Sequence, residues 1–249
     1  MFKIVILTLV LLVFAPENSS RRLILQPTII NGDNVNITEV PYQLMLTYNK
    51  QFQCGAVLIS SKHVLTAAHC LYQNGFRSKS KINIFAGVTK KSQRYEEGHM
   101  YGVKTYIINA LFILTQYKGD IAVIYPDKKI IIDNYTVKPI ALAKQSYRSG
   151  YEALASGWGL VDDQGTLPDN LQAAYIKTTP CIVFRDSICS EGYLNGICKG
   201  DSGGPLVYNN KLIGIARAKI SIDGKCALQS ELYSSVYYYR DFIKRYTRL

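Results

Sequence analysis

Several features are scarce in this 249-residue chain, which has three histidines, one tryptophan, no internal repeat and no low-complexity linker. Its N-terminal apolar run covers residues 4–14 and is shorter than the roughly 20 residues that a membrane-spanning helix needs. A short apolar run after a charged start is instead typical of a secretory signal peptide. We therefore expect a signal peptide over residues 1–20, cleaved somewhere between Ala15 and Ser20, with no membrane association and a secreted product.

The cysteines include no Cys-x-x-Cys pair, and no histidine lies near the later ones, so their spacing does not favour a zinc site. An even number of cysteines in a secreted chain predicts three disulfides. Spacing alone leaves their pairing open. The two Asn-x-Thr triplets at Asn36 and Asn134 would accept glycans on surface loops in a host that glycosylates. The six cysteines are Cys54, Cys70, Cys181, Cys189, Cys198 and Cys226.

The sequence also lacks runs of one charge, although its formal net charge is +11. Lysine and arginine are scattered singly, which favours a solvated basic surface over a nucleic-acid-binding patch. Because no basic patch is present, we predict no nucleic-acid partner. A basic surface still attracts acidic proteins and peptides through its long-range field.

Short apolar stretches and frequent turns predict an all-β fold. Residues 81–85 alternate polar and apolar side chains, and β-branched or apolar runs stand at 56–59, 64–66, 130–132 and 153–155. Paired asparagines at 209–210 predict a tight hairpin turn. Many short strands of this kind favour a β-barrel or sandwich.

Helical periodicity is confined to residues 235–248, where Tyr239, Phe242, Ile243 and Tyr246 recur at three- and four-residue spacing. The three tyrosines at 237–239 are either a stacking surface for a ligand or the packed and exposed rims of this helix. The second interpretation is favoured, because aromatic residues are ordinary core material.

The stretch Gly200-Asp201-Ser202-Gly203-Gly204-Pro205 has the composition that a nucleophilic serine needs. Glycines on both sides allow a tight turn and close approach of a substrate. The stretch also fits the Gly-x-Ser-x-Gly elbow of α/β-hydrolases, but that class places its histidine after the serine. All three histidines of this chain precede Ser202, which argues against that fold.

A serine hydroxyl requires a base whose pKa lies near neutral pH, and histidine is the natural candidate. His69 ends an apolar stretch and precedes Cys70, whereas His63 and His99 stand in polar surroundings. Asp120 heads the apolar run 121–124, so its carboxylate is predicted to be buried with a partner. Alternatively, Asp120 has a purely structural role and caps a turn.

Four motifs in this order resemble the chymotrypsin/trypsin-like serine protease family, from residue 29 to the C-terminus. The resemblance implies two six-stranded antiparallel β-barrels, near residues 29–145 and 146–249, with a C-terminal α-helix and an active site between the barrels. It assigns general base and acid catalysis to His69, orientation of the imidazole to Asp120, nucleophilic attack to Ser202, and an oxyanion hole to the N–H groups of Gly200 and Ser202. The motifs are Thr66-Ala67-Ala68-His69-Cys70, Asp120-Ile121-Ala122-Val123, Ser156-Gly157-Trp158-Gly159 and Gly200-Asp201-Ser202-Gly203-Gly204-Pro205.

The same resemblance implies a disulfide pairing and a zymogen switch. A new N-terminal amine at Ile29 would pair with Asp201 after removal of a short propeptide over residues 21–28. Thr28 stands where the family usually has Arg or Lys, so a trypsin-like activator is not expected to cut there. The implied pairs are Cys54 with Cys70, Cys181 with Cys189, and Cys198 with Cys226.

The substrate pocket departs from the trypsin pattern. The aspartate that trypsin-like members carry six residues before the serine is Gly196 here, so cleavage after Lys or Arg is not expected. Lys199, Arg217 and Lys219 would give a basic rim that favours acidic or small residues, and the ring of Tyr233 could fill the pocket.

We predict a secreted serine endopeptidase with a Ser-His-Asp triad and an acyl-enzyme intermediate. The alternative is a catalytically impaired homologue that acts as a secreted binding protein or decoy. The expected partners are a protein or peptide substrate, an activating protease and protein protease inhibitors. We expect a monomer that uses no metal and no cofactor.

Overall fold

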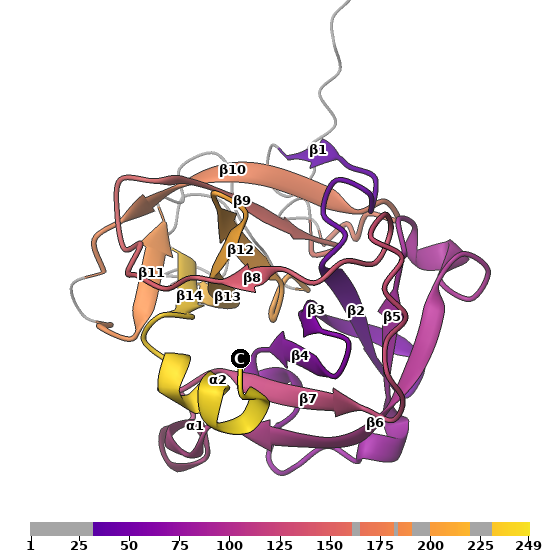
Figure 1. Ribbon diagram of the computed structural model, residues 1–249, viewed down its shortest axis with the longest axis horizontal. Coiled ribbons are helices and arrows are strands. Elements are labelled where there is room, and N and C mark those ends of the chain that lie inside the picture. Colours follow the sequence, from indigo (N-terminus) through magenta and orange to yellow (C-terminus); the bar gives the residue numbers. More distant parts are fainter. Residues whose placement is uncertain (1–31, 161–164, 182–183, 191–199, 220–230) are drawn as a thin grey trace, which may run out of the picture.

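The computed structural model describes residues 32–160, 165–181, 184–190, 200–219 and 231–249 (Figure 1). The predictions for the signal peptide, the propeptide, Ile29, Gly196, Lys199, Cys198 and Cys226 fall outside these residues. Within the described part of the chain, no helix has the length and apolar character required to cross a membrane.

The first half of the chain closes into a six-stranded barrel in the order β2-β3-β4-β7-β6-β5, and every neighbouring pair is antiparallel. The stretches 56–59 and 64–66 lie on β3 and β4 as predicted, and the alternating stretch 81–85 corresponds to β5. The strands are β2 (Gln43–Tyr48), β3 (Gln51–Ser60), β4 (His63–Thr66), β5 (Ile82–Ala86), β6 (His99–Ile108) and β7 (Ala122–Pro126).

The second half forms another six-stranded ring, β9-β10-β11-β14-β13-β12, which closes because β9 also pairs with β10. Two short strands extend this sheet: β1 pairs with β10, and β8 pairs in parallel with β13. The prediction of two six-stranded antiparallel barrels is confirmed. The strands are β1 (Asp33–Asn34), β8 (Ala141–Leu142), β9 (Glu152–Gly157), β10 (Gln172–Thr179), β11 (Ser187–Ser190), β12 (Pro205–Tyr208), β13 (Lys211–Lys219) and β14 (Glu231–Ser235).

The hairpin predicted at 209–210 is present, whereas the strand predicted at 130–132 is not. The predicted hairpin is confirmed between β12 and β13, where Asn209 and Asn210 have φ values of 46° and 54°. The apolar run 130–132 is not a strand. The N–H of Ile130 donates to the Ser61 carbonyl at 2.8 Å and that of Ile131 to the Tyr101 hydroxyl at 3.0 Å, so these bonds replace a strand ladder.

Helices fill the corners between and beside the barrels. The C-terminal helix α2 begins at Arg240, five residues later than predicted, because residues 231–235 continue the sheet as β14. Ile243 and Tyr239 are buried in the core cluster that also contains the first-barrel residues Leu65 and Val123, so α2 helps to join the two halves. The helices are η1 (Ala68–Cys70), η2 (Lys79–Lys81), η3 (Lys91–Gln93), α1 (Ala110–Thr115) and α2 (Arg240–Thr247).

Candidate active site

His69 lies on the single turn η1 that follows β4, between the buried residues Ala68 and Cys70. Its Nδ1 atom lies 2.7 Å from Oδ2 of Asp120, and its backbone N–H donates to Oδ1 of the same carboxylate at 2.9 Å. Because a carboxylate can only accept hydrogen bonds, Nδ1 carries the proton and Nε2 presents a lone pair. The imidazole is about one-third exposed, with 34% of its side-chain surface accessible.

Asp120 is held from both barrels. It is buried, with 4% of its surface exposed, and stands two residues before β7. Its carbonyl oxygen accepts from the Ser234 hydroxyl on β14 at 2.6 Å, and the N–H of the preceding Gly119 donates to the Tyr239 hydroxyl at 2.9 Å. The predicted burial with a partner is therefore present, and His69 is that partner.

The turn that carries Ser202 is bonded to both barrels. The carbonyl of Ser202 accepts from the N–H of Gly55 on β3 at 2.8 Å, and the N–H of Gly203 donates to Ala216 on β13 at 2.7 Å. Gly203 has a φ of +82°, in the left-handed region that favours glycine.

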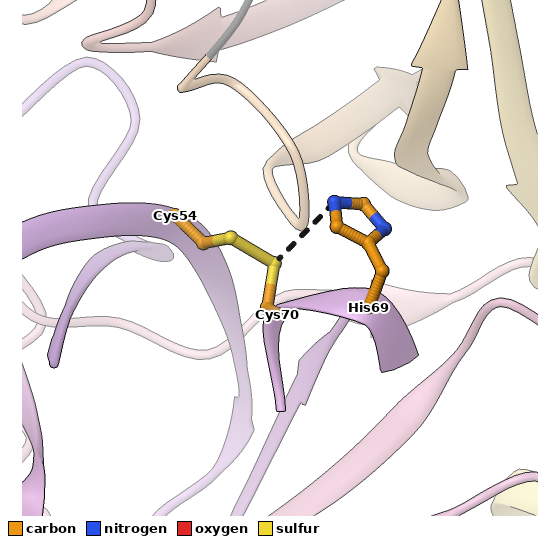
Figure 2. Close-up of side chains that lie close together, drawn as sticks. All are labelled: Cys54, His69 and Cys70. Atoms are coloured by element: carbon orange, nitrogen blue, oxygen red, sulfur yellow. Dashed lines mark hydrogen bonds between the residues drawn. A yellow bond between two sulfur atoms is a disulfide. The ribbon is translucent and has the colours of Figure 1, made fainter. Parts of the chain in front are cut away.

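The Cys54–Cys70 disulfide contacts both the His69 ring and the backbone of the Ser202 turn. Sγ of Cys70 lies 3.9 Å from Nε2 of His69 (Figure 2) and 3.8 Å from the carbonyl oxygen of Ser202. Both are contacts rather than donated hydrogen bonds, because a disulfide sulfur has no proton. The structure thus brings the His69–Asp120 pair and the Ser202 turn to one point on the seam between the barrels.

Two predicted disulfides are present, Cys54–Cys70 and Cys181–Cys189. The first ties β3 to the turn that carries His69. It also accounts for the grouping of Cys54, His69 and Cys70 side chains, which has the spacing of a metal site. The two sulfurs are bonded to each other, so neither is a thiolate ligand, and we infer no metal site there.

Asp201 explains the glycines of the Ser-Gly-Trp-Gly motif. Its carboxylate is fully buried, and Oδ1 accepts from the N–H of Gly159 at 2.8 Å. A Cβ atom on Gly157 would lie 2.2 Å from Oδ1, and one on Gly159 would lie 2.4 Å from Oδ2. Only glycine therefore leaves room for this carboxylate beside the Ser202 turn.

A lysine that the sequence analysis did not single out also lies close to this region. Nζ of Lys91 lies 5.1 Å from the centroid of the Phe52 ring. Burial lowers the pKa of the Lys91 ammonium, while the carboxylates of Asp169 and Asp201 act against that shift. The influence of Asp201 on this pKa places the Lys91 ammonium within electrostatic range of the buried carboxylate.

The residues assigned to the substrate pocket lie in different surroundings from those expected. Arg217 is buried, with 5% of its surface exposed, and its guanidinium pairs with Asp186 at 3.5 Å and with the Ser187 hydroxyl at 2.8 Å. It belongs to the interior rather than to an exposed basic rim. Lys219 ends β13, but its side chain is outside the described part of the structure.

Tyr233 is fully buried and takes part in a polar cluster that the sequence analysis missed. Oε2 of the fully buried Glu231 accepts from the Tyr233 hydroxyl and from the Ser190 hydroxyl, both at 3.0 Å. Burial raises the pKa of the Tyr233 hydroxyl well above its ordinary value, and the Glu231 carboxylate raises it further, so Tyr233 stays a donor. A sequence signal existed, because Glu231 is the one charged residue between 226 and 239.

The two predicted glycan acceptors are both on the surface. Asn36 is exposed in the segment before β2, and Asn134 is exposed at a φ of +63° in the loop after β7. Beside Asn134, burial would raise the pKa of the Asp133 carboxyl, but hydrogen bonds from the Thr136 hydroxyl and three backbone N–H groups hold it at about 2.

Two barrels of this topology, with a helix closing the chain, define the chymotrypsin-like class of fold. A family model described as Trypsin matches residues 29–243. The chain therefore belongs to the trypsin family of serine endopeptidases.

Named relatives agree with this assignment. The chain is 29% identical over 239 residues to a trypsin of Phaedon cochleariae, with 89% of each chain covered. It is 33% identical over 230 residues to chymotrypsin-2 of Vespa crabro, covering 87% of this chain and 99% of the relative. Among solved structures, a mutant of human heparin binding protein matches with a TM-score of 0.77 at 21% identity, covering 86% of this chain and 94% of that one. This last likeness supports the fold alone.

Proposed function

We propose that the protein is a secreted endopeptidase that hydrolyses peptide bonds through Ser202, His69 and Asp120. Oγ of Ser202 attacks the carbonyl carbon of the substrate, and its proton passes to Nε2 of His69. Asp120 stabilises the imidazolium that forms. Nε2 then gives the proton to the departing amine, and a water molecule, deprotonated by the same nitrogen, hydrolyses the acyl-enzyme.

The observation that carries this proposal is the His69–Asp120 pair beside the Ser202 turn. The bonds to Nδ1 and to the backbone N–H fix the ring, so that Nε2 is the free basic nitrogen. The backbone N–H groups of Gly200 and Ser202 are the proposed donors to the oxyanion, and each such donor is typically worth about 3 kcal/mol in the transition state.

Activation is proposed to depend on a new N-terminus at Ile29. Its amine would pair with the buried Asp201 and order the turn that supplies the oxyanion hole. The two described disulfides agree with secretion, because such bonds persist in oxidising compartments. We also propose that a protease other than a trypsin-like enzyme cuts before Ile29. The active form is proposed to be a monomer and to be bound by protein protease inhibitors.

Labelling with a fluorophosphonate probe tests both activity and activation. An enteropeptidase site placed directly before Ile29 would give a precursor and, after cutting, a form that begins at Ile29. We expect Ser202 to be labelled in the cut form and about a hundredfold more slowly in the precursor, whose oxyanion hole is not ordered. Ser202→Ala is the matched control and should remain unlabelled. A cut form that resists the probe would favour the alternative, a binding protein on a protease scaffold.

Specificity is proposed to differ from that of trypsin, because Gly196 supplies no carboxylate at the position where trypsin-like members carry aspartate. We expect a peptide library digested by the cut form to show no preference for Lys or Arg before the scissile bond. A strong preference for those residues would contradict the proposal. In that case Glu231, the buried carboxylate bonded to Tyr233 and Ser190, would be the group that pairs with the Lys or Arg side chain of the substrate.

A further inference from the structure

A basic cavity lies on the second barrel, where the chain leaves β14 and enters α2. Its volume is about 420 Å³, and three arginines line it from three separate segments of the chain: Arg148, Arg185 and Arg240. Tyr237 and Tyr238, 45% and 55% exposed, contribute ring surface to the same cavity. The three tyrosines at 237–239 therefore have different surroundings. Tyr239 is buried in the core cluster, whereas Tyr237 and Tyr238 line this cavity.

Two of the arginines are held in place by backbone carbonyls. Nη2 of Arg148 donates to the carbonyl of Cys181 at 3.2 Å, and Nη1 of Arg240 donates to the carbonyl of Ala143 at 3.1 Å. A guanidinium has five N–H donors, so each bond leaves most of them for a ligand. Among the described residues, the contacts within 4.0 Å between a basic and an acidic side chain involve only His69 and Arg217 as the basic partners. Asp241 lines the cavity, yet it forms no such pair.

A second cavity, of about 280 Å³, lies beside the first and shares the lining residues Arg185 and Tyr238 with it; we call the two cavities together the groove. It adds a cation, Lys118, and two apolar side chains, Leu111 on α1 and Phe184. Asp186 also lines this cavity, but its carboxylate is already bonded to buried groups. It accepts from the Tyr239 hydroxyl at 2.5 Å and pairs with Arg217.

The second cavity ends close to the proposed catalytic acid. The N–H of Gly119, the residue before Asp120, donates to the hydroxyl of Tyr239, which lines this cavity. Figure 1 shows α1 and the C-terminal helix α2 together at this edge of the molecule. The groove therefore runs from the arginines to the segment that carries Asp120.

We propose that this groove binds an acidic segment of the protein substrate, away from the scissile bond. Arginine guanidinium groups bind carboxylates through paired, charge-assisted hydrogen bonds. Leu111 and Phe184 would accept an apolar or aromatic side chain of the same segment. A peptide offers both kinds of group, whereas a sulfated polysaccharide offers only the anions. The excess of lysine and arginine over aspartate and glutamate would also speed the approach of an acidic partner.

Binding can be measured without catalysis. The Ser202→Ala protein, cut before Ile29, is titrated into a fluorescent peptide of Glu and Asp residues with one central Phe, and anisotropy is recorded. We expect Arg185→Gln and Arg240→Gln each to weaken binding about tenfold, as expected for the loss of charge-assisted hydrogen bonds. Arg245→Gln is the matched control: it is exposed on the same helix but does not line the cavity. It should change affinity less than twofold.

Three results would overturn the proposal. The first is equal binding of a peptide with Gln and Asn in place of the acids. The second is equal weakening by Arg185→Gln and Arg245→Gln. The third is tight binding of a heparin fragment that depends on Arg185 when the acidic peptide does not bind. Because the assay uses the Ser202→Ala protein, failure of the proposed triad would leave its outcome unchanged.

Discussion

Asp120→Asn is expected to lower kcat about 10⁴-fold at neutral pH and to change KM by less than about threefold. The carboxylate accepts from Nδ1 of His69 at 2.7 Å, which leaves Nε2 free to take the proton of Ser202. An asparagine amide can donate to Nδ1 instead. The proton then moves to Nε2, and the ring is held in the tautomer that cannot act as a base.

The measurement is steady-state hydrolysis of a peptide ester and of a peptide amide by the form that begins at Ile29. Asp127→Asn is the matched control, because it removes an exposed carboxylate directly after the same strand, β7. That variant should keep at least half of the wild-type kcat. An Asp120→Asn enzyme within tenfold of the wild type would contradict the role proposed for this carboxylate.

The sequence was sufficient to predict the contact between His69 and Asp120, beside the turn of Ser202, because these residues stand in local patterns with a physical meaning. Asp120 heads an apolar run, His69 ends another, and glycines flank Ser202. Burial of an acid demands a partner, and the structure supplies it through two bonds to one carboxylate. Two disulfide pairs were likewise predicted, although only through the family resemblance and not from spacing.

The direction in which a side chain points was much harder to predict. Arg217 was assigned to a basic rim from its position along the chain, yet it is buried against Asp186 and Ser187. Asp186 carries no local sign of this, since its partners Arg217 and Tyr239 are 31 and 53 residues away. The cluster of Glu231, Tyr233 and Ser190 was missed for the same reason, because Ser190 comes from a different strand.

The fold class followed from many short stretches, but single stretches were less certain. The run 130–132 has strand-like composition but forms no strand, because the N–H groups of Ile130 and Ile131 donate to the Ser61 carbonyl and the Tyr101 hydroxyl instead of to a strand ladder. The helical spacing from Tyr239 to Tyr246 was correct, whereas the start at 235 was too early because Ser235 pairs with Gly214 across the sheet. Local pattern therefore predicts the type of element better than its partners or ends.

Gly203→Ala is expected to cost about 2–5 kcal/mol of the free energy of unfolding, which would greatly reduce the secreted yield. Two effects combine at this position. An alanine at φ +82° pays about 1–2 kcal/mol for the left-handed backbone. Its Cβ would also lie 2.3 Å from the carbonyl oxygen of Gly55 and 2.2 Å from Oγ1 of Thr66, and such overpacking typically costs a further 1–3 kcal/mol or so.

Gly150→Ala separates these two effects. Gly150 has nearly the same φ, +81°, but a Cβ there meets nothing within 4 Å. It should therefore lose only the backbone part, about 1–2 kcal/mol. Denaturant unfolding in the Ser202→Ala background, which prevents self-digestion, measures both. Equal losses in the two variants would show that the Ser202 turn can move away from Gly55. In that case the close packing of the two barrels would not be what holds the serine in place.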